Sequence, residues 1–250
     1  MKTLLKTLLV GSALTAASAQ AATINFTYDP GAAAAEAAFV GSLHSIVATE
    51  DFNSIATPGT QVIGANDQSS WEMAAPSIAT SVGNFTLVTH GQEHGNPERD
   101  SLMIESGATG EFGREEYGPD DMWLDSNDAR SVRWDFDQPA GGYFNAVGFY
   151  LADVGDVNAS LTLEFTDGTS MTVEASEFIP YGQTNGNIGY LTLVSDKNIL
   201  GGYMMFNNST GNDGWGIDNV TIGTVPEPGT LLLMGLGLLG LGAARRRAAK

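Results

Sequence analysis

The sequence predicts an all-β body in which antiparallel sheets pack face to face as a β-sandwich. Short segments with alternating apolar and polar residues recur from about residue 50 onward. Gly, Asn, Asp and Pro separate these segments, and no long helical patterns alternate with them. Two terminal segments of different composition flank this region, so they are set aside before the fold is considered.

The clearest strand pair lies at residues 160–173. Apolar and polar residues alternate on both sides of Asp167-Gly168, a dipeptide that favours a tight hairpin turn. A short alanine-rich helix is expected at 32–40. Further strands are expected at 50–53, 60–63, 85–89, 131–136, 146–151, 188–194, 202–206 and 215–222. The aromatic residues expected in the core are Trp134, Phe136, Phe149, Phe165 and Trp215.

Residues 1–22 are expected to be a signal peptide that forms a helix. Lys2 and Lys6 give a positive start, and residues 4–17 supply an apolar stretch. Ala17-Ser18-Ala19 and Ala19-Gln20-Ala21 both fit the small-x-small pattern of a cleavage site. A helical lead-in at 23–44 and the β-sandwich at 45–224 would follow, and we call residues 23–224 the body.

Residues 225–250 combine a proline pair, an apolar segment and a basic end. Pro226-Glu227-Pro228 precedes an apolar run at 230–244, and Arg245-Arg246-Arg247 follows it. As a helix this run would be roughly 22 Å long, which is shorter than a ~30 Å hydrocarbon core. Flanking residues and local thinning of the bilayer can make up part of the difference. The arginines favour the cytoplasmic side, which would leave the body outside, anchored by a single transmembrane helix.

This C-terminal arrangement resembles the PEP-CTERM sorting signal of exported proteins, a tail also labelled ice-binding protein C-terminal domain. The resemblance rests on Pro226, Glu227 and Pro228, the apolar span, and the basic cluster of Arg245, Arg246 and Arg247. It implies that an exosortase-type enzyme recognises and removes the tail. The protein would be membrane-anchored until that step, and would then reach the cell surface or the extracellular polysaccharide.

The charge of the body argues against nucleic-acid partners. Of the 11 basic residues, six lie in the two terminal segments, whereas Glu227 alone of the 29 acidic residues does. The body therefore holds five basic and 28 acidic residues, a formal net charge of −23. Such a surface repels phosphate backbones. The chain also has no cysteine, which excludes thiolate nucleophiles, zinc–thiolate sites and iron–sulfur clusters.

Four motifs of the body resemble the jelly-roll domain that is common in PEP-CTERM proteins and is similar to carbohydrate-binding modules. They are 132–139, 145–150, Asp167-Gly168 and 214–220. The resemblance implies a jelly-roll-like sandwich, but no ligand motif matches, so no ligand-binding residues follow from it.

The body offers one candidate metal site, for a structural Ca²⁺. Asp51 lies in the first expected sandwich strand and Asp218 in the last, and Glu50 is a third candidate ligand. In jelly-roll modules these strands often lie close together, and Ca²⁺ binds carboxylate and carbonyl oxygens. The alternative is that Asp218-Asn219 turns or caps a strand end while Asp51 is solvated. No other cofactor is expected.

The most acidic part of the body, at 111–128, also leaves two interpretations open. Seven acids surround Phe112, Tyr117 and Trp123, a composition that suits a glycosidase or a sugar-binding surface. The simpler interpretation is a long acidic surface loop, which we favour over catalysis. We therefore expect a non-catalytic structural or carbohydrate-binding-like protein of the extracellular polysaccharide, and a secreted glycosidase-like hydrolase is the alternative.

Overall fold

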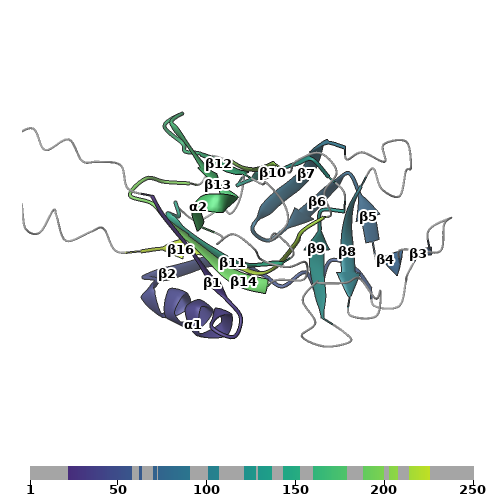
Figure 1. Cartoon of the computed structure of the whole chain (residues 1–250), viewed down its shortest axis with the longest axis horizontal. Helices are drawn as coiled ribbons and strands as arrows, with labels where there is room; N and C mark the ends of the chain where they lie inside the picture. Colours follow the sequence, from purple (N-terminus) through teal and green to yellow (C-terminus); the bar gives the residue numbers. More distant parts are fainter. Residues whose placement is uncertain are drawn as a thin grey trace, which may run out of the picture.

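The computed structural model describes residues 22–57, 62–63, 70–71, 73–90, 101–106, 121–127, 129–136, 143–152, 160–178, 188–199, 203–207 and 214–225. The expected signal helix lies outside these ranges except for Ala22, and the expected transmembrane helix at 230–244 lies entirely outside them. Within them, no helix is both long and apolar enough to cross a bilayer. The described part is built mainly from antiparallel strands (Figure 1).

The larger sheet has eight strands. Its order is β1 (Thr23–Tyr28), β14 (Ile188–Val194), β11 (Ala146–Ala152), β16 (Gly216–Thr224), β9 (Met122–Asp125), β8 (Leu102–Ser106) and β5 (Met73–Ala75). The eighth strand, β2 (Ser45–Glu50), also pairs with β16. As a result β16 lies inside the sheet, with β11 along one edge and both β9 and β2 along the other.

The second sheet has six strands and contains the predicted hairpin. Its order is β13 (Ser170–Glu174), β12 (Ser160–Glu164), β15 (Tyr203–Asn207), β10 (Ser131–Asp135), β7 (Gly83–Thr89) and β6 (Ser77–Thr80). Leu163 pairs with Met171, and Gly168 adopts a positive φ of 77°, so the turn at Asp167-Gly168 is confirmed. A small separate sheet is formed by β3 (Val62–Ile63) and β4 (Ser70–Trp71).

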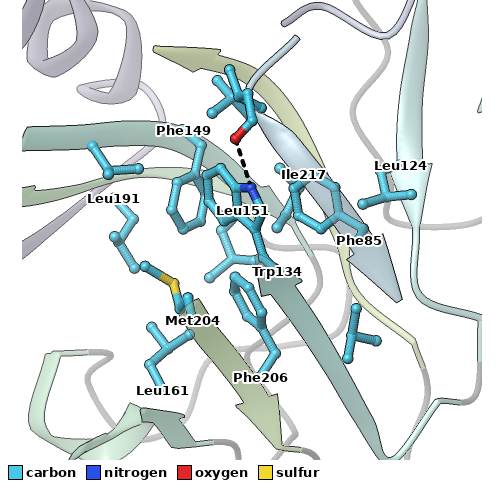
Figure 2. Packing of buried hydrophobic residues seen from close by; sticks show 14 of the residues in the cluster. Phe85, Leu124, Trp134, Phe149, Leu151, Leu161, Leu191, Met204, Phe206 and Ile217 are labelled. Carbon is cyan, nitrogen blue, oxygen red and sulfur yellow. Dashed lines mark hydrogen bonds between the residues drawn. The ribbon is translucent and has the colours of Figure 1, made fainter. Parts of the chain in front are cut away.

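The two large sheets share one apolar core, which is consistent with the predicted β-sandwich. Trp134 of the six-stranded sheet stacks on Phe85 at 4.7 Å and meets Phe149 of the eight-stranded sheet at 5.9 Å between ring centroids. Its indole Nε1 donates a hydrogen bond to the Val82 carbonyl oxygen at 3.1 Å (Figure 2). The core aromatic residues predicted from the sequence are all buried, which confirms them: Trp134, Phe136, Phe149, Phe165 and Trp215.

Two helices accompany the sheets. The alanine-rich helix α1 (Ala32–Ser42) contacts β14 and β11, and in Figure 1 it lies on the side of the larger sheet away from β12 and β10. Phe39 of α1 is buried and packs on Tyr190 at 6.1 Å between ring centroids. The short helix α2 (Ala175–Phe178) follows β13 directly.

The structure differs from the sequence-based expectation at several places, and β4, β5, β6 and α2 are not expected from the sequence. The lead-in at 23–44 begins with a strand, β1, which pairs with β14 along its whole length. The strand expected at 50–53 instead ends at Glu50. The acidic middle of the chain contains β8 and β9, in which every side chain is buried. A strand buried on both faces has no alternation of apolar and polar residues, so the pattern that predicts strands is missing there.

Candidate functional site

The predicted acidic residues meet at an interruption in the pairing of β16. Its residues Gly216 and Ile217 pair with β9, and its residues from Val220 onward pair with β2. Asp218 and Asn219 fall between these two partners, and Asn219 has a positive φ of 47°. On the opposite edge, the register with β11 shifts between Gly148 and Tyr150. The expected proximity of the first and last sandwich strands is therefore confirmed by the pairing of β2 with β16.

Asp218 is a buried carboxyl group in a negative environment. Its side chain is 2% exposed, and its Oδ1 accepts a hydrogen bond from the backbone N–H of Asn219 at 2.6 Å. Burial is the largest cause that raises the pKa of Asp218 well above its ordinary value, and the charges of Asp121, Asp51 and Glu36 raise it further. The fold thus places an acid where its ionised form is costly unless a proton or a cation compensates the charge.

Asn53 joins Asp51 and Asp121, because its backbone N–H donates to the first and its side-chain amide donates to the second. Asp51 Oδ1 accepts a hydrogen bond from the backbone N–H of Asn53 at 3.1 Å. The Asn53 amide nitrogen then donates to Asp121 Oδ1 at 3.1 Å, and its oxygen accepts from the backbone N–H of Met122 at 2.8 Å. These hydrogen bonds connect the loop after β2 to the start of β9. They bring Asp51 and Asp121 together near the point where the pairing of β16 is interrupted.

Glu50 has a structural role. It is 7% exposed, and its two oxygens accept hydrogen bonds from different segments: the backbone N–H of Phe52 at 2.9 Å and the backbone N–H of Ser81 at 2.8 Å. Phe52 has a positive φ of 55°, an uncommon conformation for an aromatic residue, and its fully buried ring lies 6.2 Å from that of Phe85. Glu50 therefore holds the turn that places Asp51.

A surface cavity of about 360 Å³ opens beside these residues. Its lining includes the carboxylates of Glu36, Glu50 and Asp51 and the polar side chains of Ser54, Ser81 and Asn219, but no basic residue. Glu36 comes from α1, and its Oε2 accepts a hydrogen bond from the Tyr150 hydroxyl at 2.9 Å. The cavity is negatively charged, so it suits cations or hydroxyl-bearing groups better than anions.

The arrangement of the acids does not by itself establish the predicted calcium site. Among the described residues, no group of three or more Asp, Glu, His or Cys side chains is arranged to hold a metal ion. A Ca²⁺ ion at Asp51 and Asp218 would therefore need backbone carbonyls and water for most of its six to eight oxygen ligands. The buried charge of Asp218 fits such an ion, whereas Glu50 already accepts two backbone N–H groups. Calcium at this place stays a prediction.

Two further residues of the site were not identified from the sequence. Asp121 lies far along the chain, and it comes near Asp218 because it precedes β9, which pairs with β16, and because it bonds Asn53. Glu36 reaches the cavity because α1 docks on β14 and β11. Neither position carries a local sequence signal, since both depend on contacts between distant segments.

The acidic segment 111–128 is only partly described. Residues 122–125 form β9, where Trp123 is 2% exposed and Asp125 1% exposed, so the interpretation as a surface loop is wrong for these four residues. Residues 111–120 and Asp128 lie outside the described part of the chain. No pair of catalytic carboxylates can be assigned from the described residues of this segment.

The expected sorting segment begins where the last strand ends. β16 runs to Thr224, whose carbonyl oxygen accepts a hydrogen bond from the backbone N–H of His44 at 2.7 Å. The backbone N–H of Val225 donates to Asn145 Oδ1 at 2.8 Å. The sorting residues Pro226, Glu227 and Pro228, and the arginines Arg245, Arg246 and Arg247, lie outside the described residues.

Comparisons with known proteins identify this segment. Residues 224–247 match the family described as the PEP-CTERM protein-sorting motif. No curated protein matches the chain.

Among solved structures, the chain is similar to the enzymatically active domain of tailspike protein 4 from bacteriophage CBA120. The identity is 16% and the TM-score 0.31, and the match covers 50% of this chain but 18% of the tailspike chain. The sorting segment and the fold together describe the molecule: the chain carries a PEP-CTERM protein-sorting motif at residues 224–247, directly after a β-rich body.

Proposed function

We propose that the chain is a non-catalytic protein of the extracellular polysaccharide layer, with a jelly-roll-like β-sandwich body that binds glycan. The PEP-CTERM motif indicates an exported protein that is anchored through its C-terminus and processed by an exosortase-type system. The observation that carries the proposal is the position of this motif at the last residue of β16. Every described strand precedes it, so removal of the tail would release the complete body outside the cell.

The charge of the body supports a glycan partner in that compartment. A formal net charge of −23 keeps the body soluble and repels nucleic acid and acidic proteins. Neutral glycans carry no charge to be repelled, and they can be held by hydrogen bonds from polar side chains. The protein would thus be a passive component that the sorting system delivers to the polysaccharide.

The expected result is that the exported protein co-sediments with the extracellular polysaccharide of the cells that produce it, and that no sugar is released. The measurement compares the bound fraction with that of an unrelated acidic protein of similar size, and follows the formation of new reducing ends. An equal bound fraction for both proteins would contradict glycan binding. New reducing ends would contradict the non-catalytic assignment and favour the hydrolase.

We also propose that Ca²⁺ stabilises the body through Asp218 and Asp51. If the ion binds only the folded protein, Ca²⁺ at about 100 times its dissociation constant adds about 2.7 kcal/mol, or roughly 5 °C or more in Tm. Asp218→Asn removes the buried charge, so in chelator this variant is expected to melt above the wild type, and Ca²⁺ should not raise its Tm further.

Calorimetry or a thermal melt with chelator and with Ca²⁺ checks this prediction. Glu174→Gln is the matched control, because Glu174 is an exposed acid on β13, in the other sheet. This control should show the same calcium response as the wild type. A wild-type Tm that does not change with Ca²⁺ would contradict the calcium site. Asp218 would then be a residue that turns or caps the strand.

A further inference from the structure

The outer face of the six-stranded sheet presents an ordered set of polar side chains around a single tyrosine. Residues of β12, β15 and β10 alternate between the two faces: Leu163, Met204 and Trp134 point into the core, so their neighbours in each strand point outward. Opposite residues form a row across the sheet, in which Glu164 pairs with Tyr203, Tyr203 with Asp135, and Asp135 with Asn84. We call Glu164, Tyr203, Asp135, Asn84 and the adjacent Arg133 the polar platform.

The side chains of the polar platform hold one another in place. The Arg133 guanidinium carbon lies 3.8 Å from the centroid of the Tyr203 ring. Arg133 Nε and Nη2 donate to Asp135 Oδ1 at 2.8 and 2.6 Å. A hydrogen bond to Glu164 is the largest cause that raises the pKa of the Tyr203 hydroxyl above its ordinary value. Side chains fixed in this way lose little conformational freedom when a ligand binds.

The platform is accessible to a ligand. The side chains of Arg133 and Asp135 are 39% and 25% exposed, and Tyr203 is partly exposed. Among the described elements, none besides the neighbouring strands makes an extended contact with β10, β15 or β12. The sheet occupies the upper part of Figure 1, and its six strands span roughly 24 Å at ~4.8 Å per strand. A flat polymer can therefore lie across several strands at once.

The composition and charge of the face select the kind of ligand. Arg133 covers one face of the Tyr203 ring, so a sugar would stack on the opposite ring face or on the outer face of the guanidinium. Carboxylate, amide and hydroxyl groups match sugar hydroxyls as acceptors and donors. Thr162 and Thr172 add a hydroxyl pair 2.9 Å apart on the same sheet. Protein interfaces instead need an apolar centre depleted of charge. The net charge of −23 opposes an acidic polymer and a second copy of this chain.

We propose that the polar platform is the glycan-binding surface of the body and that it takes an uncharged polysaccharide, with the Tyr203 ring as its central contact. This inference rests on the proposed function, because it locates the binding that the proposed function requires. It is separate from the acidic cavity beside β2, since no residue of the polar platform lines that cavity. Calcium at Asp218 is not needed for it.

The test uses the full-length chain in a detergent without sugar headgroups, and affinity electrophoresis through gels that contain one soluble polysaccharide each. The neutral probes are dextran, galactomannan and hydroxyethylcellulose, and the acidic probes are alginate and hyaluronate. The wild type is expected to be retarded by at least one neutral probe and by neither acidic probe. Tyr203→Ala is expected to weaken that binding about tenfold, since it removes the ring contact.

Tyr143→Ala is the matched control, because Tyr143 is 52% exposed and precedes β11, in the other sheet. This variant should bind as the wild type does. Tyr203→Leu removes the ring but keeps a bulky apolar side chain in the strand, so it tests the site even if Tyr203→Ala does not fold, and it should bind about as weakly as Tyr203→Ala.

The outcomes separate the two proposals. Wild-type binding to a neutral probe with unchanged binding by folded Tyr203→Ala or by Tyr203→Leu would overturn the platform and leave the proposed function intact. Binding to the acidic probes alone would overturn the choice of an uncharged ligand. No binding to any probe, together with no retention by the producing cells' own polysaccharide, would overturn both proposals.

Discussion

Replacing Glu50 with alanine is expected to lower the free energy of unfolding by about 4 kcal/mol, because two backbone donors lose a charged acceptor at once. The N–H groups of Phe52 and Ser81 both donate to this side chain. Phe52 is fully buried, so its N–H is the costlier of the two to leave unpaired, whereas Ser81 is exposed and lines the cavity. Denaturant unfolding followed by tryptophan fluorescence measures the loss, since Trp134 and Trp215 are buried in the core.

Two variants make this result specific. Glu174→Ala removes an exposed acid of β13 and should change the free energy of unfolding by less than about 0.5 kcal/mol. Glu50→Gln keeps one amide oxygen as an acceptor and should lose roughly half as much as Glu50→Ala. If Glu50→Ala is as stable as Glu174→Ala, then Glu50 does not hold the turn, and the placement of Asp51 needs another cause.

Substitution of Pro226, Glu227 and Pro228 by alanine is expected to abolish maturation of the protein. The PEP-CTERM motif spans residues 224–247, and it implies recognition by an exosortase-type enzyme. Without the Pro-Glu-Pro sequence the tail would stay attached, and the protein would remain in the membrane fraction. Intact mass and C-terminal mapping of the protein from membrane and surface fractions measure this directly.

The control for this experiment changes a neighbouring residue and leaves the motif whole. Thr230→Ala should be processed and released as the wild type is. Release of the alanine-substituted protein with the same mature C-terminus as the wild type would contradict recognition of Pro-Glu-Pro. Because the body is unchanged in both variants, its thermal stability should not differ, which separates a sorting defect from a folding defect.

The predictable part of the fold is the part with a regular pattern. The β12–β13 hairpin follows from alternation on both sides of Asp167-Gly168, and the structure pairs Leu163 with Met171 as that pattern requires. β8 could not be found in this way, since Glu105 and Ser106 are as buried as Leu102 and Ile104. Their burial depends on the segments that cover both faces of the strand, and the local sequence does not show which segments these are.

The candidate site shows the same division. Asp51 and Asp218 could be predicted as neighbours, because the first and last strands of such sandwiches adjoin. The hydrogen bonds from two backbone N–H groups to Glu50 could not be predicted, because Ser81 reaches Glu50 from a turn 31 residues away. The polar platform required the register of four strands, since Glu164, Tyr203, Asp135 and Asn84 are scattered along the sequence and meet only in the sheet.

The inner position of β16 governs when the exported chain can fold. This strand pairs with β11, β9 and β2, yet it is the last strand of the chain and ends at Thr224. A chain that leaves the cytoplasm N-terminus first cannot complete the larger sheet until this strand has emerged, because long-range pairing must await its partner. The sorting motif begins at the last residue of this strand, so the larger sheet can be completed only when the motif itself has reached the membrane.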